Sequence, residues 1–146
     1  MAPDLAAVQQ LLTQVALPTV GVEAIFAHHA SDFVVATDPS NDDAVIAVGG
    51  LEVCGQHALL RSIAVHPAWQ GQSLGALLVT RLIAQAESRG LDALYLLTTT
   101  ADAYFPRFGF SLVSRSEVPI AIAQTLEFAG ACPASATAMC KPLAPR

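Results

Sequence analysis

The chain has 146 residues and a formal net charge of −5 at pH 7; 53% of its residues are hydrophobic and 13% are charged. This length predicts one domain over residues 1–146, and so apolar a composition favours a sheet that is covered on both faces. The lack of a basic stripe argues against nucleic-acid binding, and no apolar run is long and unbroken enough to predict a membrane span.

Charged residues and cysteines are placed unevenly along the chain. All seven Lys and Arg residues follow residue 60, which is consistent with an anionic ligand bound by the second half and equally with drift of surface charge. The three cysteines, Cys54, Cys132 and Cys140, form no Cys-x-x-Cys pair, so neither a disulfide framework nor a metal site is predicted. The N-terminus lacks the basic segment of a signal peptide, and we therefore expect a cytoplasmic protein.

Two helices are predicted before any strand. Apolar residues at helical spacing predict a helix over 4–15, and a second, shorter helix is predicted over 19–28. Strands at 33–37 and 44–53 then flank a turn rich in Asp, Asn, Pro and Ser. These two strands predict a hairpin.

A unit of strand, helix and strand forms the middle of the chain. The first strand is predicted over 58–65, the helix over 74–89 with Gly90 just past its end, and the second strand over 93–98. Strands that are joined by a helix usually lie parallel, so this unit predicts a parallel crossover.

Shorter elements complete the chain. A helix is predicted over 102–108 and a strand over 110–114. Ser116 is predicted to cap a helix that runs to Ala129, and a last strand over 135–141 closes the sheet. The order of elements predicts the α/β class, with a single mixed sheet and helices on both of its faces.

The turn before the helix at 74–89 is the most informative segment. It reads Gln70-Gly71-Gln72-Ser73-Leu74-Gly75 and is followed by Ala76. A tight turn that leads into a helix presents unpaired backbone N–H groups and the positive end of the helix dipole, which together favour a phosphate. The segment has neither the three glycines of the dinucleotide fingerprint nor the Gly-Lys-Ser/Thr end of a Walker loop. We therefore predict a pyrophosphate site of another type.

This turn resembles the acetyl-CoA-binding signature of the GCN5-related N-acetyltransferase (GNAT) superfamily. In that signature Gln or Arg is followed by two residues, Gly, one residue, and Gly or Ala. Gln70 and Gly75 match its ends, whereas Ser73 stands at the middle glycine and could replace it if its φ is negative. The resemblance implies a GNAT-like acyl-CoA N-acyltransferase fold whose usual first strand is missing before Asp4. It also implies that residues 70–76 bind the diphosphate of acetyl-CoA.

The second half of the chain is similar to a small bacterial subgroup named as arsenic-resistance N-acetyltransferases. The segments that carry this similarity are 94–101, 108–110, 117–119, 128–130 and 132–136. The similarity implies a setting near arsenic genes, and an amine-bearing arsenical is one acceptor that would suit it.

The superfamily resemblance also implies contacts to the rest of the cofactor. In the superfamily, the strand before the phosphate turn bulges and offers free backbone N–H groups to the pantetheine arm and the thioester carbonyl. This implies such a role for Ile63, Ala64 and Val65, although an ordinary buried strand would also explain these residues. Thr98 is implied as a further pantetheine contact, although strand propensity alone explains a threonine there.

Tyr104 is the candidate acid for the departing thiolate. The superfamily often has a tyrosine four residues before the Gly of its Gly-Phe pair, but here that position is Phe105 and the tyrosine comes one residue earlier. Core packing of the Tyr104 ring is the alternative. A thiol with a pKa near ~8.5 also leaves with help from water alone.

Glu52 is the candidate base for the proton of the amine. Many superfamily members have a glutamate two residues before the position of Ile63, where this chain has Arg61. Arginine stays protonated, so Arg61 is a candidate anchor for an acidic acceptor, or else one partner of a salt bridge at the rim. Glu52, on the neighbouring strand, is the nearest plausible carboxylate, and a solvated position on the strand face is its alternative.

Together these features predict an N-acetyltransferase that moves an acetyl group from acetyl-CoA to a small, amino-acid-like amine. Two alternatives stay open. Arg61 and Phe105 at the usual base and acid positions suggest a catalytically idle acyl-CoA-binding module, and the cysteines suggest a metalloid-binding protein. The sheet edge left by the missing first strand favours a homodimer.

Overall fold

The computed structural model describes residues 5–14, 33–42, 44–71, 73–98, 103–125 and 136–143. The helix predicted over 19–28 and the last part of the helix predicted up to Ala129 lie outside these residues. The chain divides into two compact units, one of Met1–Leu51 with Ser62–Leu82 and one of Glu52–Arg61 with Ile83–Arg146. Three elements, β2 (Ala44–Cys54), β3 (His57–Val65) and α3 (Leu74–Ser88), begin in one unit and end in the other.

The first unit opens with α1 (Leu5–Gln14) and a hairpin made of β1 (Phe33–Asp38) and β2. The two strands pair antiparallel, from Phe33↔Gly50 to Asp38↔Ala44, which confirms the predicted hairpin. Between them lies the short 3-10 helix η2 (Pro39–Asn41), where the Asp38 carboxylate accepts the backbone N–H of Ser40 at 3.0 Å. The side chain of Asp38 thus closes the turn locally.

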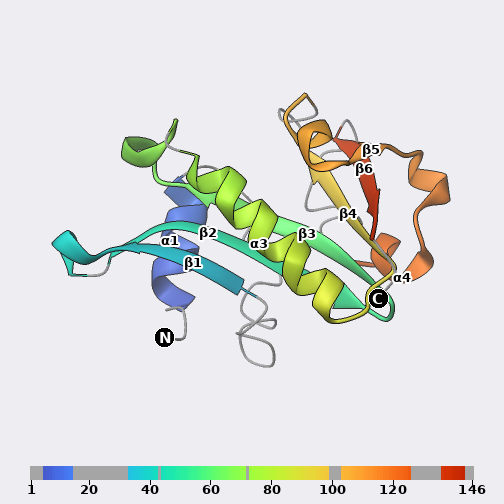
Figure 1. The fold of residues 1–146 in the computed structure, drawn as a ribbon, viewed down its shortest axis with the longest axis horizontal. Coiled ribbons are helices and arrows are strands. Elements are labelled where there is room, and N and C mark those ends of the chain that lie inside the picture. The colour runs from blue at the N-terminus through green and yellow to red at the C-terminus, as the bar shows by residue number, and fades with distance from the viewer. Residues whose placement is uncertain are drawn as a thin grey trace. The chain divides into compact units, whose positions relative to one another are not determined.

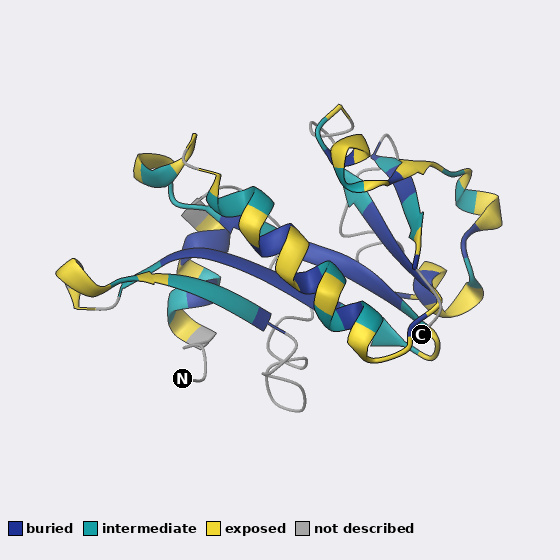
Figure 2. Ribbon diagram, in the orientation of Figure 1, coloured by how far each residue is buried: buried dark blue, intermediate teal, exposed yellow. Residues whose placement is uncertain are grey.

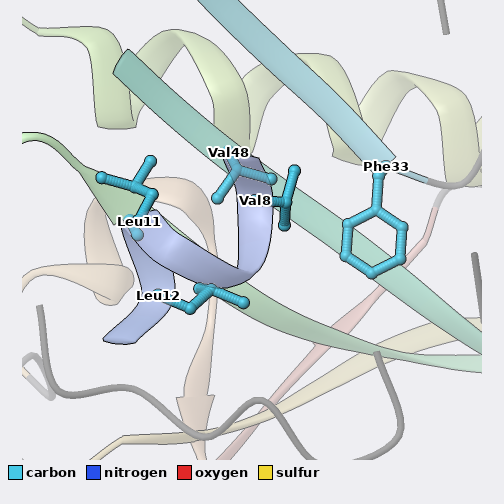
Figure 3. Close-up of a cluster of buried hydrophobic side chains, with 6 residues drawn as sticks. Val8, Leu11, Leu12, Phe33 and Val48 are labelled. Atoms are coloured by element: carbon cyan, nitrogen blue, oxygen red, sulfur yellow. The ribbon is translucent and has the colours of Figure 1, made fainter. Parts of the chain in front are cut away.

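Helices cover both faces of β2 within this unit (Figure 1). The α1 residues Val8, Leu11 and Leu12 form a buried cluster with Phe33, Val48 and Ala64 (Figure 3). On the opposite face, a Cβ added to Gly49 would lie 2.6 Å from Cδ1 of Ile63 and 2.8 Å from Cδ1 of Leu82 in α3. Because neighbouring strand residues point to opposite faces, α1 and α3 lie on opposite sides of this strand.

Helix α3 is amphipathic, as its sequence predicted. Buried positions recur one turn apart at Leu78, Leu82 and Ala86. Figure 2 shows dark, buried bands that alternate with exposed ones along α3. The helix is followed by Gly90, whose φ of 73° is the left-handed conformation that commonly ends a helix. This confirms the predicted end of the helix.

The second unit contains the remaining strands. These are β4 (Ala93–Thr98), β5 (Ser111–Leu112) and β6 (Thr137–Pro142). β3 and β4 pair parallel from His57↔Ala93 to Leu59↔Tyr95, which confirms the predicted crossover. β6 pairs antiparallel with both β4 and β5. Hydrogen bonding therefore links the strands in the order β1-β2-β3-β4-β6-β5, a mixed sheet of the predicted α/β class.

The region after β5 differs from its prediction. The side chain of Ser114, not of Ser116, caps a 3-10 helix, η5 (Arg115–Glu117), and the separate four-residue helix α4 (Ile120–Ala123) begins only after Pro119. Proline lacks an N–H and fixes φ, so it is tolerated at the start of a helix but not in its interior. The single helix predicted from Ser116 is therefore wrong at its start. The strand predicted over 110–114 is also shorter: the register with β6 covers Ser111 and Leu112, and after them the N–H of Val113 donates to the carbonyl oxygen of Ala138 at 3.0 Å.

Candidate active site

The predicted phosphate turn joins β3 to α3 in the first unit. It starts with the 3-10 helix η3 (Pro67–Trp69), where Nδ1 of His66 accepts the N–H of Ala68 at 3.1 Å. Nε2 of Gln70 donates to the carbonyl oxygen of Val65 at 3.1 Å and so ties the turn to the end of β3. Gly71 follows with a φ of 86°. Gln72, also predicted to contact the cofactor, lies outside the described residues.

Ser73 has a φ of 65°, in the left-handed region. A negative φ was the condition under which a serine was expected to replace the middle glycine, and the structure contradicts it: the backbone keeps the conformation that glycine adopts most easily. The carbonyl of Ser73 accepts the N–H of Leu77 at 3.1 Å, which makes Ser73 the N-cap of α3. The N–H groups of the first helical turn, at Leu74, Gly75 and Ala76, therefore have no partner within the helix.

Strand β3 carries an irregularity at Ser62. This buried residue has a φ of 62°, and a left-handed residue inside a strand is typical of a β-bulge. The position lies directly before Ile63, Ala64 and Val65, the residues predicted to meet the thioester. In the described part of the chain the parallel register with β4 ends at Leu59↔Tyr95, whereas β3 continues to Val65.

In the second unit, an ion pair joins the candidate anchor to the candidate base. Nη1 of Arg61 in β3 donates to Oε1 of Glu52 in β2 at 3.1 Å. The side chain of Arg61 is 0% exposed and that of Glu52 is 25% exposed. The structure thus contains the salt bridge that was the alternative for Arg61, with the guanidinium buried and the carboxylate partly open. Removing one partner of such a pair would leave an uncompensated buried charge.

Tyr104 packs among aromatic rings before the 3-10 helix η4 (Phe105–Phe108). Its ring makes edge contacts with Phe105 and Phe108 at centroid distances of 5.4 and 5.3 Å, and the guanidinium of Arg107 lies 4.4 Å from the ring centroid. Phe105, at the position of the family's usual acid, is buried against Phe110. The ring of Tyr104 therefore has a packing role, and a catalytic role for its hydroxyl stays a prediction.

Thr98 is the last residue of β4. It is half-buried and lies opposite Thr137 of β6 in the antiparallel register. A contact between Thr98 and pantetheine stays a prediction.

The model of the acetyltransferase (GNAT) family matches residues 5–110. The chain belongs to the GNAT acetyltransferase family. The amino-acid acetyltransferase of Escherichia coli strain K12 is 39% identical over 57 residues, which are 39% of this chain and 13% of that relative. The amino-acid acetyltransferase of Proteus mirabilis is 36% identical over 58 residues, again 13% of its length. The match to these curated relatives thus spans only a small part of their length.

Solved structures share the GNAT fold of this chain. Rv2747 from Mycobacterium tuberculosis, in complex with CoA and NLQ, superposes with a TM-score of 0.77 at 23% identity, over 99% of this chain and 96% of that one. N-acetylglutamate synthase from Neisseria gonorrhoeae, complexed with coenzyme A and N-acetyl-glutamate, has a TM-score of 0.76 at 20% identity, over 96% and 32%. A GNAT acetyltransferase from Staphylococcus aureus has a TM-score of 0.79 at 13% identity, over 99% and 98%.

Two cysteines of this GNAT protein, Cys54 and Cys140, pack against the same buried cluster of the second unit. Burial raises the pKa of both thiols, and the charge of Glu52 raises that of Cys54 further. In the sheet order, β3 and β4 lie between their strands, and three strand spacings separate them by roughly 14 Å. A disulfide needs Cα atoms within ~7 Å, so these two thiols can share neither a disulfide nor a single ion. Cys132 lies outside the described residues.

Tyr95 of β4 is not among the site residues expected from the sequence. Burial raises the pKa of Tyr95 to about 12, and its hydrogen bond with Cys140, its partner on β6, adds to the shift. The ring of His57 meets that of Tyr95 edge-on, with centroids 5.8 Å apart. Only the strand register brings these three side chains together, and the sequence carries no spacing signal for it.

The described residues contain no group of three or more His, Cys, Asp or Glu side chains that could hold a metal ion. Among the helices that the structure describes, none has the length and apolar character to cross a membrane.

Proposed function

We propose that this GNAT family member transfers the acetyl group of acetyl-CoA to the amine of a small, amino-acid-like acceptor. The observation that carries the proposal is the left-handed φ of Ser73, at the family's middle glycine and at the N-cap of α3. A serine in this conformation costs about 1 kcal/mol or more. With this conformation, Ser73 leads into α3 in the way a glycine would, and the N–H groups of residues 74–76 are left for a diphosphate.

The chemistry needs a base for the ammonium group and a route for the thiolate to leave. We assign the base to Glu52, whose carboxylate is partly exposed. One ammonium proton passes to it, the amine nitrogen bonds to the thioester carbonyl carbon, and the C–S bond breaks. The second proton leaves the nitrogen for solvent, while Tyr104 or water protonates the thiolate. In this proposal the backbone of 63–65 and Thr98 receive the acyl and pantetheine parts of the cofactor.

The relatives' names favour an acceptor that carries both an amine and a carboxylate. The curated relatives are named as amino-acid acetyltransferases, and one structural neighbour was crystallised with N-acetyl-glutamate. An amine-bearing arsenical is a narrower member of this class, and it follows only from the subgroup similarity. The relatives named above do not point to arsenic, so we rank free amino acids first.

A screen of acetyl-CoA consumption against amines, amino acids and amine-bearing arsenicals tests the proposal. Binding of acetyl-CoA is measured by calorimetry in parallel, for the wild type and for Gly75→Phe. The phenylalanine side chain would project from the first turn of α3, where the diphosphate is proposed to bind. We expect the variant to lose binding by at least ~100-fold. The matched control is Gly55→Ala, a left-handed glycine in the β2–β3 turn with no atom within 4 Å of an added Cβ. Wild-type protein that gives no heat with acetyl-CoA would overturn the proposal.

The idle-module alternative has its own support in the buried Arg61 and Phe105. It predicts binding of acetyl-CoA without turnover on any amine. The partly exposed carboxylate of Glu52 favours the enzyme, because it supplies a proton acceptor next to Arg61. The metalloid alternative loses support from the separation of Cys54 and Cys140 across the sheet.

A further inference from the structure

We propose that Arg61 is a positioning residue, which orients Glu52 as the base and does not itself hold the acceptor. The inference rests on the proposed function, because it concerns the proton acceptor of that same reaction. It replaces the expectation that Arg61 binds an anionic group of the acceptor.

Exposure decides which of the two side chains can meet a ligand. The Arg61 side chain is 0% exposed, while that of Glu52 is 25% exposed, and the two are joined at 3.1 Å. A molecule that arrives from solvent meets the carboxylate. For the guanidinium to bind an acceptor, Glu52 would first have to move away, which would break an ion pair whose positive end is fully buried.

The pair is also held by rigid elements. Glu52 and Arg61 belong to the adjacent strands β2 and β3, which are joined by the short turn at Gly55 and Gln56. Between them along this hairpin, Cys54 and Leu59 pack on the buried cluster of the second unit. Side chains that project from packed strands are held in place better than side chains on loops. A carboxylate fixed in this way is suited to a proton transfer that depends on geometry.

The stability of the fold alone does not call for this pair. Replacing a buried ion pair by well-packed apolar residues is often neutral or stabilising, so the pair is weak evidence of a role in stability. A guanidinium has only donors and cannot take a proton at neutral pH. It can hold Oε1 of Glu52 while the other oxygen stays available to accept the proton of an ammonium group. This division of roles also explains why the base is on β2 while β3 carries an arginine.

Steady-state kinetics of four variants test the inference. These are Glu52→Gln, Arg61→Met, Arg61→Lys and the double variant that combines Glu52→Gln with Arg61→Met. We expect E52Q to lower kcat by at least ~100-fold, the usual scale for a general base. R61M should lower kcat by about tenfold or more, with the acceptor KM within about twofold of wild type. R61K, which keeps one charged donor, should recover most of this loss. The double variant should be no slower than E52Q, because the two residues act as one unit.

Each rival gives a different result. If Arg61 anchors the acceptor, R61M raises KM about tenfold at unchanged kcat, and does so only for amines that carry a carboxylate. If its role is merely structural, R61M lowers thermal stability and the fraction of active enzyme, while R61K gives no selective recovery of kcat. Either result overturns the inference. Calorimetry with acetyl-CoA and thermal unfolding of every variant provide the controls, and R61K carries the test if R61M does not fold.

Failure of the proposed function looks different. In that case the wild type acetylates no amine, or E52Q is as active as wild type. If instead the wild type is active, E52Q is inactive and R61M keeps full kcat, the proposed function stands and the role of Arg61 alone is wrong.

Discussion

Val48 and Gly49 are neighbours in β2 that face opposite sides of the sheet. Val48 packs with α1, whereas Gly49 leaves the space that Ile63 and Leu82 fill beneath α3. The missing side chain thus lets α3, the helix whose first turn is the proposed diphosphate site, approach the strand closely. The position of this helix therefore depends on a glycine in β2, outside the proposed diphosphate site.

Gly49→Ala should destabilise the protein by about 1–3 kcal/mol, because the new methyl group overpacks this contact. Its Cβ would lie 2.6 Å from Cδ1 of Ile63. Ile63→Val removes that atom, so the double variant should lose less stability than the sum of the two single variants. Urea denaturation of all three measures this coupling. Strict additivity would show that the backbone moves apart and that the contact is not limiting.

Ser73→Gly should stabilise the protein by about 0.5–1 kcal/mol, since glycine adopts a φ of 65° without a Cβ penalty. Under the proposed function it should also tighten acetyl-CoA binding severalfold. Asp42→Gly is the matched control, because Asp42 has a φ of 52° in the β1–β2 turn. It should bring a similar gain in urea denaturation with no change in the calorimetric affinity. Equal affinities for wild type and S73G would show that the Cβ of Ser73 does not hinder the cofactor.

Tyr104→Phe keeps the ring contacts with Phe105, Phe108 and Arg107 and removes only the hydroxyl. If the hydroxyl protonates the thiolate, kcat should fall about tenfold or more while thermal stability stays within a few degrees. The measurement is kcat for one acceptor found in the screen. An unchanged kcat would leave water as the proton source and the ring as a packing residue.

Tyr95→Phe tests a titration at alkaline pH. The pKa of Tyr95 is raised from 10.0 to about 12 in the folded protein. Between these values the unfolded chain has lost the proton and the folded chain keeps it, so the free energy of unfolding falls as pH rises. The difference in unfolding free energy between wild type and Y95F should therefore be largest below pH ~10 and should decrease towards pH ~12. Parallel curves for the two proteins in urea denaturation at several pH values would contradict this.

Thiol reactivity tests the state of the two described cysteines. Because burial raises the pKa of Cys54 and Cys140, little thiolate is present at pH 7.5 and both should react slowly with iodoacetamide. Cys132→Ser removes the third thiol, so mass spectrometry of that variant reports on these two alone. Denaturant should raise the rate severalfold. Fast modification in the folded protein, or protection by arsenite, would revive the metalloid alternative.

Several features of the chain were predictable because their signals are local. The short apolar runs of β1 and β2, the spacing of Leu78 and Leu82 in α3, and the glycine at 90 determine these elements over a few neighbouring residues. The turn at 70–75 showed its family resemblance in the same way. The prediction of one helix from Ser116 was wrong because Pro119 interrupts the helical pattern, so that α4 begins only after it.

From its sequence alone, the protein could be placed in the α/β class, with a parallel crossover, because backbone propensity and helix-end chemistry act over short distances. Only the tertiary structure decided that Ser73 keeps the left-handed conformation of a glycine, that Glu52 and Arg61 form a pair, and that Cys54 and Cys140 lie on strands too far apart to cooperate. These relationships depend on strand order, register and burial, which arise when distant segments pack together and which no local pattern encodes.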